Sequence, residues 1–299
     1  MHRYRHSGLE IASEIALPEW DGFASSSTSN ADIKIKLSDE RSPAFPGDGS
    51  TYSLGSTAGF CIEGVGGWKL EAGRRMTLYP SLAVDPAELR LFTLGSAWGV
   101  LGYQRGDAMW HGSAVELDGS AVLFCGDAGE GKSTMAAAMV ATGARLFGDD
   151  LSKVEPNAGG ALIHPSSSRL KLWGAAVDHF GWRERVVQRD VMRGDKFHCH
   201  IEPNHAGGPP LPLAAIVVLE SGEAPLLEPL SGSEALAEVL SGTIYRPEAL
   251  ETMGRWGEQG ALVARIIAGA KVFRLTRPRD LGAIGESVGL VSKMLDRLG

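Results

Sequence analysis

Short, continuous apolar runs separated by helical patterns dominate the second half of the chain. Three of these runs have the length and composition of buried strands, namely 121–125 (Ala-Val-Leu-Phe-Cys), 213–219 and 272–275. A run without polar alternation is typical of a strand covered on both faces, and helical segments between such strands are typical of an α/β fold. The pattern therefore predicts an α/β domain in this half of the chain.

Two further elements of this domain follow from the same pattern. Residues 111–117, the pair Asp118-Gly119 and the run from Ala121 predict a strand, a tight turn and a second strand. After Asp280, a residue type that caps helices, apolar residues recur every three or four positions. These positions are Leu281, Ile284, Val288, Val291, Leu295 and Leu298. We expect a C-terminal helix that packs on the core.

Residues 1–84 have a different, irregular pattern that is rich in Ser, Gly and Pro. The alternating stretch 33–37 (Ile-Lys-Ile-Lys-Leu) predicts a half-buried strand. The segment 24–30 is almost entirely Ser, Thr and Ala, and 41–50 contains two Pro and two Gly, so both are expected to be loops. This part of the chain is predicted to be a small β-rich module.

A helix start marks the expected domain boundary. Asp85 can cap a helix whose first position is Pro86, because a proline at that position lacks only an N–H that would stay unpaired. Apolar residues that could form the buried stripe of this helical region are Leu89, Phe92, Trp98 and Leu101. We place a β-rich N-terminal module at 1–84 and the second domain at 85–299.

Charge and composition exclude several classes of partner. The chain has 36 acidic and 29 basic residues, a formal net charge of −7, so no global positive field attracts nucleic acid or an anionic membrane. No apolar run approaches the ~20 residues that span a bilayer, and residues 1–6 are not followed by an apolar signal-peptide core. Cys61, Cys125 and Cys199 form no CxxC pair, which argues against a disulfide framework or a zinc ribbon. We expect a cytoplasmic protein without nucleic-acid or membrane partners.

The clearest chemical signal is a glycine-rich loop that matches G-x-x-x-x-G-K-[ST] at every fixed position. It follows the first buried strand and precedes 134–140, a run of good helix formers. Glycines let backbone N–H groups surround a phosphate, the helix N-terminus adds partial positive charge, and the lysine reaches the outer phosphates. Nucleotide binding is therefore predicted for Gly126, Asp127, Ala128, Gly129, Glu130, Gly131, Lys132, Ser133 and Thr134.

Two adjacent carboxylates, Asp149 and Asp150, follow a predicted short strand near Leu146. The carboxyl end of a strand is where α/β sheets hold ligands, and neighbouring side chains point in different directions. One carboxylate can then face the γ-phosphate and the acceptor, while the other faces a metal or a histidine. Asp149 comes only sixteen residues after Ser133, which is closer than a typical Walker B aspartate. An exposed acidic turn is the alternative interpretation.

These residues together resemble the core of the HPr kinase/phosphorylase superfamily. The matching positions are Trp110-His111-Gly112-Ser113-Ala114-Val115, Gly119, Val122, the loop 126–133, Gly143, Leu146 and Asp149-Asp150. Pro165, residues 169–173 and Phe180-Gly181 resemble the second signature of this superfamily. The N-terminal module and the variant Lys171-Leu172-Trp173 are more similar to HPr kinase-related kinases that accompany lasso-peptide biosynthetic genes.

The resemblance implies a P-loop, HPr-kinase-like C-terminal domain that uses ATP and Mg²⁺ to phosphorylate a serine. In that arrangement Lys132 neutralises phosphate charge and Ser133 binds Mg²⁺. Asp149 is the catalytic base toward the serine hydroxyl, and Asp150 and His111 complete the catalytic shell, with Asp150 also on the metal side. A carboxylate that orients and deprotonates the nucleophile suits phosphoryl transfer, whose loose transition state needs positioning and charge neutralisation.

The sequence departs from the pattern of the superfamily that it resembles in the second signature. HPr kinases proper have a Glu-Ile-Arg-Gly-x-Gly run where this chain has Lys171-Leu172-Trp173-Gly174-Ala175-Ala176. A carboxylate that could help hold the metal is thus replaced by Lys171, and the run associated with phosphorolysis of the product is missing. Lys171 could contact phosphate instead, or it could be an exposed strand lysine.

A stretch after the second signature has a local excess of basic residues, although the chain as a whole is acidic. Residues 182–196 contain five basic and three acidic residues. Such a stretch is usually a solvated helix face, but guanidinium groups could also bind a carboxylate of a peptide acceptor. The candidate substrate-binding residues are Lys171, Arg183, Arg185, Arg189 and Arg193, with Lys196 at the end of the stretch.

Three hypotheses remain at this stage. The leading one is an ATP-dependent serine kinase of a peptide or protein, most specifically of a lasso-peptide precursor at a C-terminal serine. The second is a kinase of an HPr-like carrier protein, and the third is a nucleotide-sensing module that transfers no phosphate. Asp149-Asp150 argue against a sensor, which needs no base. The sequence allows a homo-oligomer and fixes neither the oligomeric state nor ATP over GTP.

Overall fold

The computed structural model describes residues 1–38 and 51–298, which form two compact units of mixed α/β structure. The first unit comprises residues 1–109 and 245–259, and the second comprises 110–244 and 260–299. The sequence placed the boundary at 84/85, so the structure moves the helical region after Pro86 into the first unit. The predicted loop at 24–30 is a loop, and the one predicted at 41–50 lies outside the described residues.

Side-chain hydrogen bonds explain why the helices after Pro86 belong to the first unit. The indole Nε1 of Trp68 donates to Thr93 Oγ1 at 3.0 Å in a fully buried position. The hydroxyl of Tyr103 donates to the carbonyl of Tyr245 at 2.6 Å, and Arg255 donates to the carbonyl of Tyr103 at 2.7 Å. These contacts join residues distant in the sequence, so no local pattern predicts them.

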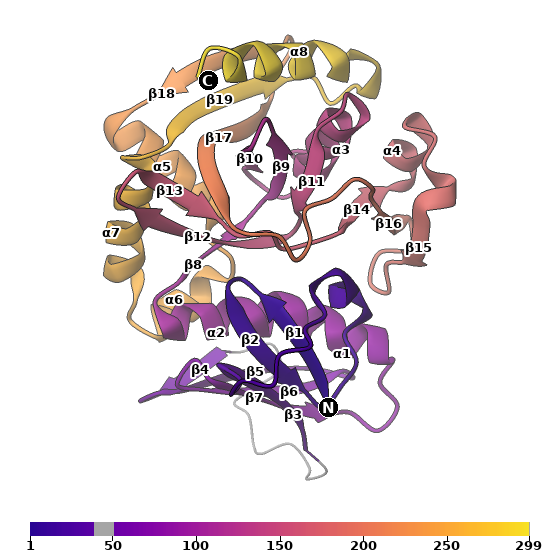
Figure 1. Ribbon diagram of the computed structural model, residues 1–299, viewed down its shortest axis with the longest axis vertical. Coiled ribbons are helices and arrows are strands. Elements are labelled where there is room, and N and C mark those ends of the chain that lie inside the picture. Colours follow the sequence, from indigo (N-terminus) through magenta and orange to yellow (C-terminus); the bar gives the residue numbers. More distant parts are fainter. Residues whose placement is uncertain (39–50, 299) are drawn as a thin grey trace. The chain divides into compact units, whose positions relative to one another are not determined.

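The first unit is built on one sheet, drawn in indigo and purple in Figure 1. Within the described residues its strand order is β1-β2-β3-β7-β6-β5-β4. The strands are β1 (His2–His6), β2 (Leu9–Ser13), β3 (Ile33–Leu37), β4 (Thr51–Leu54), β5 (Thr57–Ile62), β6 (Gly66–Glu71) and β7 (Arg75–Pro80). The helical elements are η1 (Pro18–Phe23), α1 (Pro86–Phe92), the π-helical turn η2 (Thr93–Ala97), α2 (Trp98–Arg105) and α6 (Pro247–Thr252). The predicted strand at 33–37 and the cap of Asp85, which accepts from Ala87 N at 2.8 Å, are confirmed.

The second unit is built on a larger mixed sheet with strand order β11-β9-β10-β17-β13-β12-β8, extended by β19 beside β17 and by β18 beside β19. Its strands are β8 (Ala108–His111), β9 (Ser113–Leu117), β10 (Ser120–Cys125), β11 (Arg145–Gly148), β12 (Leu151–Asn157), β13 (Gly160–Ile163), β17 (Leu211–Ser221), β18 (Leu226–Leu230) and β19 (Lys271–Arg277). The three predicted buried strands are β10, β17 and β19, and they pair in parallel. The predicted hairpin is β9–β10, with its turn at Asp118-Gly119 in positive φ.

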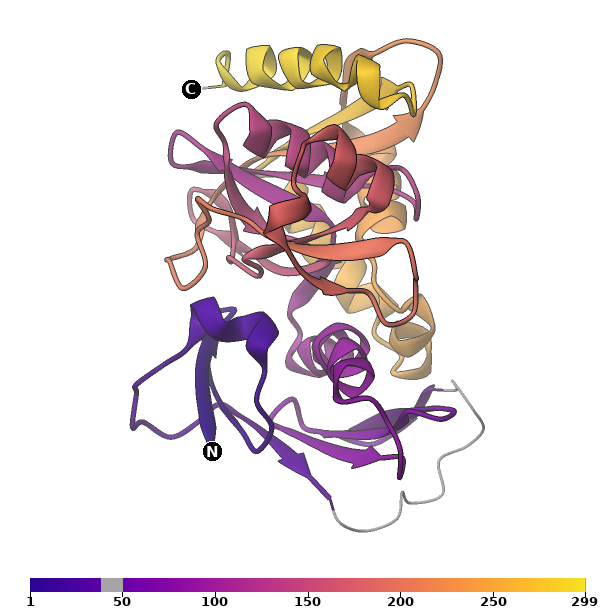
Figure 2. The same ribbon diagram turned by 90° about the vertical axis from the view of Figure 1, so that its right-hand side faces the viewer.

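Helices cover this sheet and close its core. They are α3 (Lys132–Ala141), α4 (Gly174–His179), α5 (Gly232–Thr243), α8 (Ile284–Leu295) and the 3₁₀ turns η3 (Arg183–Arg185) and η4 (Leu281–Ala283), while α7 (Trp256–Ile267) carries the chain from the first unit into the second. Figures 1 and 2 show α8 beside α3, and Met135, Val288 and Phe124 belong to one buried cluster. The predicted C-terminal helix is confirmed, although its first turn is 3₁₀ and Asp280 caps it by accepting from Gly282 N at 2.9 Å.

A separate three-stranded sheet, β14-β16-β15, lies in the second unit. Its strands are β14 (Arg169–Trp173), β15 (Val186–Arg189) and β16 (Lys196–His200). The basic stretch at 182–196 is therefore a 3₁₀ turn, the strand β15 and the connection that leads to the first residue of β16, and the solvated helix face that is usual for such a stretch is absent. The physical reason is burial, since Val186, Phe197 and Cys199 turn one side of these strands toward the core.

The described residues contain no helix that combines the length and the apolar character needed to cross a membrane.

Candidate active site

The glycine-rich loop connects β10 to α3, as the sequence predicts. Gly126 has φ 125° and Gly131 has φ 82°, conformations that glycine adopts without strain. A Cβ on Gly126 would lie 2.7 Å from the carbonyl oxygen of Leu219, and one on Gly131 would lie 2.2 Å from Nη2 of Arg277. The positive φ favours glycine at both positions, and at Gly126 the backbone of Leu219 also leaves no space for a side chain.

Lys132 starts α3 and turns its side chain back into this loop. Its Nζ donates to the carbonyl oxygens of Gly126 at 2.8 Å and Asp127 at 3.0 Å, and only 8% of the residue is exposed. Burial lowers the pKa of Lys132 from its usual value, opposed by attraction to Cys125, Asp149 and Asp150. The ammonium group therefore sits inside the loop and close to the carboxylates, where a phosphate bound by the loop would meet it.

The tip of the loop is fixed by residues at the carboxyl ends of β17 and β19. Arg277 donates from Nη2 to the carbonyl oxygen of Glu130 at 2.7 Å. The carboxylate of Glu130 accepts from Ser221 Oγ and Arg279 Nη2, both at 2.6 Å, and these bonds lower its pKa against the opposing effect of burial. Two arginines thus add positive charge beside the loop.

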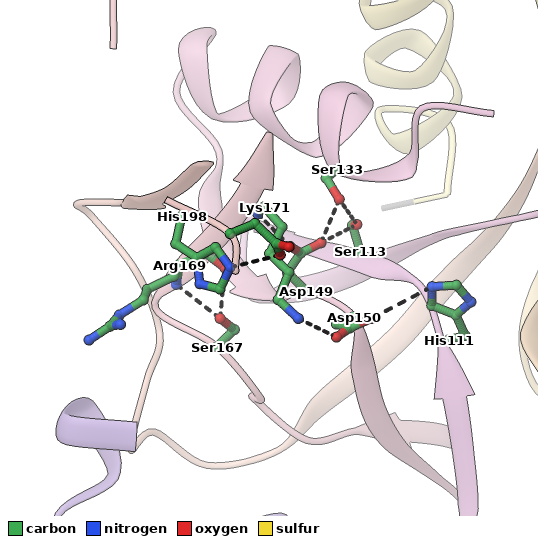
Figure 3. A network of polar contacts seen from close by, with 10 residues as sticks. His111, Ser113, Ser133, Asp149, Asp150, Ser167, Arg169, Lys171 and His198 are labelled. Carbon is green, nitrogen blue, oxygen red and sulfur yellow. Dashed lines mark hydrogen bonds and ion pairs between the residues drawn. The ribbon is translucent and has the colours of Figure 1, made fainter. Parts of the chain in front are cut away.

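Asp149 links this loop to the end of β11. Its Oδ1 accepts from Ser133 Oγ at 2.9 Å and from Ser113 Oγ at 2.6 Å, and its Oδ2 accepts from the backbone N–H of Lys171 at 2.8 Å (Figure 3). Asp149 is buried. The carboxylate is therefore held by three donors directly beside the hydroxyl that the sequence assigned to Mg²⁺.

Asp150 points away from Ser133 and toward two basic groups. Its Oδ2 lies 2.5 Å from Lys171 Nζ, and its Oδ1 lies 3.7 Å from His111 Nε2 (Figure 3). The residue adopts φ 74°, a strained conformation for a non-glycine residue of the kind that clusters at functional sites. Although burial opposes ionisation, Lys171 and His111 hold the pKa of Asp150 well below its usual range. The two adjacent carboxylates consequently face different partners, as the sequence analysis expected.

His111 is partly buried in this arrangement. Burial lowers the pKa of His111, and the attraction of Asp150 opposes that shift. The sequence-predicted catalytic set is thus brought together around the loop, with Asp149 on the side of Ser133 and His111 on the far side of Asp150 (Figure 3).

The predicted substrate-binding residues separate into two groups. Lys171 contacts Asp150, as described above. Arg183 forms an exposed ion pair with Asp178 and lies over the ring of Phe197, with 5.1 Å to its centroid. The remaining arginines contact other parts of the chain: Arg185 lies over Trp182 and donates to the Glu202 carbonyl at 3.3 Å, Arg189 donates to the Gly194 carbonyl, and the Arg193 backbone N–H donates to Asp190 Oδ1 at 2.9 Å.

Several residues at the site were not assigned by the sequence. Ser113 lay within the resembling segment, but nothing local showed that its hydroxyl reaches Asp149. Arg277 and Arg279 follow a predicted strand, and basic residues at the carboxyl end of a parallel strand are a signal that could have marked them. Lys196 was noted only as the end of the basic stretch, and the structure places it in the electrostatic field of Asp149 and Asp150.

We expect Arg277→Ala to lower the affinity for ATP about 3- to 30-fold, because it removes a charge-assisted donor and a cation from the loop. Isothermal titration calorimetry with Mg·ATP measures the change. Arg277→Lys keeps the charge and should retain part of the affinity, and Arg265→Ala, on an exposed position of α7, is the matched control. Unchanged affinity in folded Arg277→Ala would show that the arginine does not support the loop.

Comparisons with known proteins do not assign the chain to a family. No family model matches the chain, and no curated protein matches its sequence. Among solved structures, the chain is similar to the HPr(Ser) kinase/phosphatase from Coxiella burnetii, with 15% identity and a TM-score of 0.32. That match covers 64% of this chain and 99% of the Coxiella chain. A TM-score this low carries no argument about fold or function, so the functional assignment depends on the site residues themselves.

Proposed function

We propose that this protein is an ATP- and Mg²⁺-dependent kinase that transfers the γ-phosphate to a serine hydroxyl of a peptide or protein. The observation that carries the proposal is the contact between Asp149 and Ser133. It joins a loop with the G-x-x-x-x-G-K-S motif to a buried carboxylate at the end of β11, which is separated from β10 by β9 in the sheet. A phosphate bound by the loop would therefore lie beside the carboxylate that can receive the proton of an acceptor hydroxyl.

The residues present fit a nucleoside triphosphate and its metal ion. The loop supplies backbone N–H groups, the N-terminus of the ten-residue helix α3 and the ammonium group of Lys132, all of which favour a bound phosphate. Ser133 supplies a hydroxyl oxygen of the kind that Mg²⁺ takes, with Asp149 beside it. Mg²⁺, when bound, would neutralise phosphate charge and help orient the transferred group.

Asp149 is the base in this proposal. Its carboxylate is anchored by Ser113 and by the backbone of Lys171, which fixes its direction toward Ser133. A positioned carboxylate can orient a serine hydroxyl and take its proton. Asp150 is the less suited of the two for this role, because Lys171 occupies it and stabilises its ionised form. The same ion pair favours Asp150 as the electrostatic partner of Lys171 over direct ligation of the metal.

For the acceptor, we propose a flexible peptide, most specifically a lasso-peptide precursor with its serine near the C-terminus. This finer proposal depends on the Lys171-Leu172-Trp173 form of the second signature, which resembles the lasso-associated kinases. An HPr-like carrier protein is the alternative acceptor.

Incubation of the purified protein with γ-labelled ATP, Mg²⁺ and a panel of serine peptides and HPr tests the function. We expect label on peptides that carry a serine and none on the same peptides with alanine. Labelling of HPr alone would favour the carrier-protein kinase. If no acceptor is labelled although Mg·ATP binds, the protein is a nucleotide-binding module and the proposed transfer is wrong.

A further inference from the structure

One face of the three-stranded sheet β14-β16-β15 gathers three basic side chains, two histidines and a tryptophan. The antiparallel register places Arg169 opposite His200, Lys171 opposite His198 and Trp173 opposite Lys196. Opposed residues in an antiparallel pair share a face, and alternate residues point to the other side. The intervening Leu170, Leu172 and Cys199 belong to the buried core. We call the face of the sheet that holds Arg169, Lys171, Trp173, Lys196, His200 and the buried His198 the basic face.

The basic face adjoins the two carboxylates of the candidate active site. Lys171 contacts Asp149 through its backbone N–H and Asp150 through its Nζ. Figure 3 shows Lys171, His198 and Arg169 on the same side of Asp149, away from His111. A chain that presents a serine hydroxyl to Asp149 can therefore extend over this face.

Carboxylates pair with three residues of the basic face, and no ion pair joins Lys196 to a carboxylate of the described residues. Asp150 pairs with Lys171, Asp190 with His198 at 3.3 Å and Glu202 with His200 at 3.2 Å. Lys196 is held instead over the ring of Trp173, with 5.8 Å from its Nζ to the ring centroid. Burial lowers the pKa of Lys196, and repulsion from Arg193 and Lys171 acts in the same direction against attraction to Asp149 and Asp150. Lys196 is thus the cation of this face that can meet a carboxylate of a ligand, directly beside the exposed ring of Trp173.

Apolar side chains are exposed on the same small sheet and its connecting turn. Trp173 is 48% exposed, Val187 is 54% exposed and Met192 is 55% exposed. Large apolar side chains exposed beside cations are typical of surfaces that bind a partner with both apolar and acidic groups. Arg183 and Arg185, in contrast, lie over Phe197 and Trp182, whose rings belong to the core side of this sheet.

We propose that the basic face docks the acceptor, and that the acceptor is an extended peptide segment with carboxylates and an apolar side chain next to its serine. The carboxylates meet Lys196 and its neighbouring cations, and the apolar side chain packs on Trp173. This inference rests on the proposed kinase function and places docking on the basic face, away from the arginine edge at 183–189. An acidic peptide suits the face better than a nucleic acid, because the net charge of −7 repels a long polyanion.

A positional-scanning peptide library with one fixed serine tests the docking surface without knowledge of the natural acceptor. The full-length protein, γ-labelled ATP and Mg²⁺ are incubated with each pool, and Mg·ATP affinity is measured separately by calorimetry. We expect enrichment of Glu or Asp and of an apolar residue near the serine. Lys196→Glu and Trp173→Glu should each abolish the acidic preference and raise the KM of the best acidic peptide about 5- to 20-fold. Trp173 has no contact with the nucleotide loop among the interactions described, so Trp173→Glu should leave the Mg·ATP affinity unchanged.

Two control variants show which surface docks the peptide, and thermal unfolding shows that each variant is folded. Lys293→Glu, on an exposed position of α8, makes the same charge change outside the basic face and should keep the acidic preference. If Arg185→Glu/Arg189→Glu abolishes the preference while Lys196→Glu retains it, docking is at the arginine edge and the inference is wrong. Bound Mg·ATP without transfer to any peptide pool, or competition by an oligonucleotide stronger than by the acidic peptide, also overturns it. Absence of Mg·ATP binding overturns the proposed function itself, and the inference with it.

Discussion

Replacing Lys132 by alanine is expected to abolish phosphate transfer, with a loss of at least about 100-fold in kcat. Removing one preorganised charged or hydrogen-bonding group from a transition state has an effect of this size. The lysine is the cation that the loop itself directs at its centre, through bonds to the carbonyl oxygens of Gly126 and Asp127. The backbone cradle and α3 stay in place, so some nucleotide binding should survive. Steady-state transfer from labelled ATP and calorimetry with Mg·ATP measure the two effects separately.

Lys271→Ala is the control for this prediction, because it removes a lysine from an exposed position of the same unit. Lys132→Ala leaves two carbonyl oxygens without their donor, so circular dichroism and thermal unfolding are needed to show that the variant is folded. Lys132→Met fills the same space without charge and provides a second test if the alanine variant is unstable. Full transfer by either folded variant would contradict the assignment of the loop to the phosphates.

The local part of the site could be predicted from the sequence because its residues are continuous in the chain. The order of buried strand, glycine-rich loop and helix is a local property, and the structure has it as β10, residues 126–131 and α3. Asp149 and Asp150 follow β11 for the same reason. A contiguous pattern of this kind specifies its own conformation with little help from distant residues.

The second half of the site depends on pairing between strands that are distant in the sequence. Lys171 reaches Asp150 because β14 lies beside the end of β11, and the composition of neither segment shows this. The secondary structure of the basic stretch could not be predicted for the same reason, because charge alone does not distinguish a helix from a strand. Its conformation follows from β16, which pairs with both β14 and β15 and buries Cys199 between them.

The domain boundary could not be predicted either, because it depends on contacts between residues that are distant in the sequence. Asp85 and Pro86 mark a true helix start, but a helix start is not a domain boundary. The helices that follow stay with the first unit through buried contacts such as the one between Trp68 and Thr93, and residues 245–259 return to that unit much later in the chain. Side-chain contacts over such distances become visible only in the folded chain.

Asp149→Asn provides the second large expected effect and separates the roles of base and metal ligand. The amide cannot accept the serine proton, so we expect acceptor phosphorylation to fall about 10²- to 10⁴-fold, the range of general-base catalysis. Mg·ATP should still bind, because the loop and Ser133 are unchanged. Labelled transfer measures the rate, and calorimetry measures the nucleotide affinity.

The hydrogen bonds of Asp149 predict a second, structural effect of this substitution. The carboxylate accepts from Ser113, Ser133 and the backbone N–H of Lys171, whereas an asparagine has one acceptor oxygen and an amide group that donates. If its oxygen faces the two serines, its NH₂ group faces the N–H of Lys171, so one buried donor loses its partner. We expect the free energy of unfolding to fall by about 1–3 kcal/mol, measured by urea denaturation.

Asp150→Asn is the matched comparison, because it changes the neighbouring carboxylate in the same way but leaves the bonds to Ser133 and Ser113 intact. It should weaken the pairing with Lys171 and spare most of the nucleotide affinity. If the Mg·ATP affinity of folded Asp149→Asn collapses together with its rate, while Asp150→Asn keeps its nucleotide affinity and loses transfer, the roles are exchanged. Asp149 would then be the carboxylate that holds the metal beside Ser133, and Asp150, released from Lys171 when the acceptor binds, would be the base.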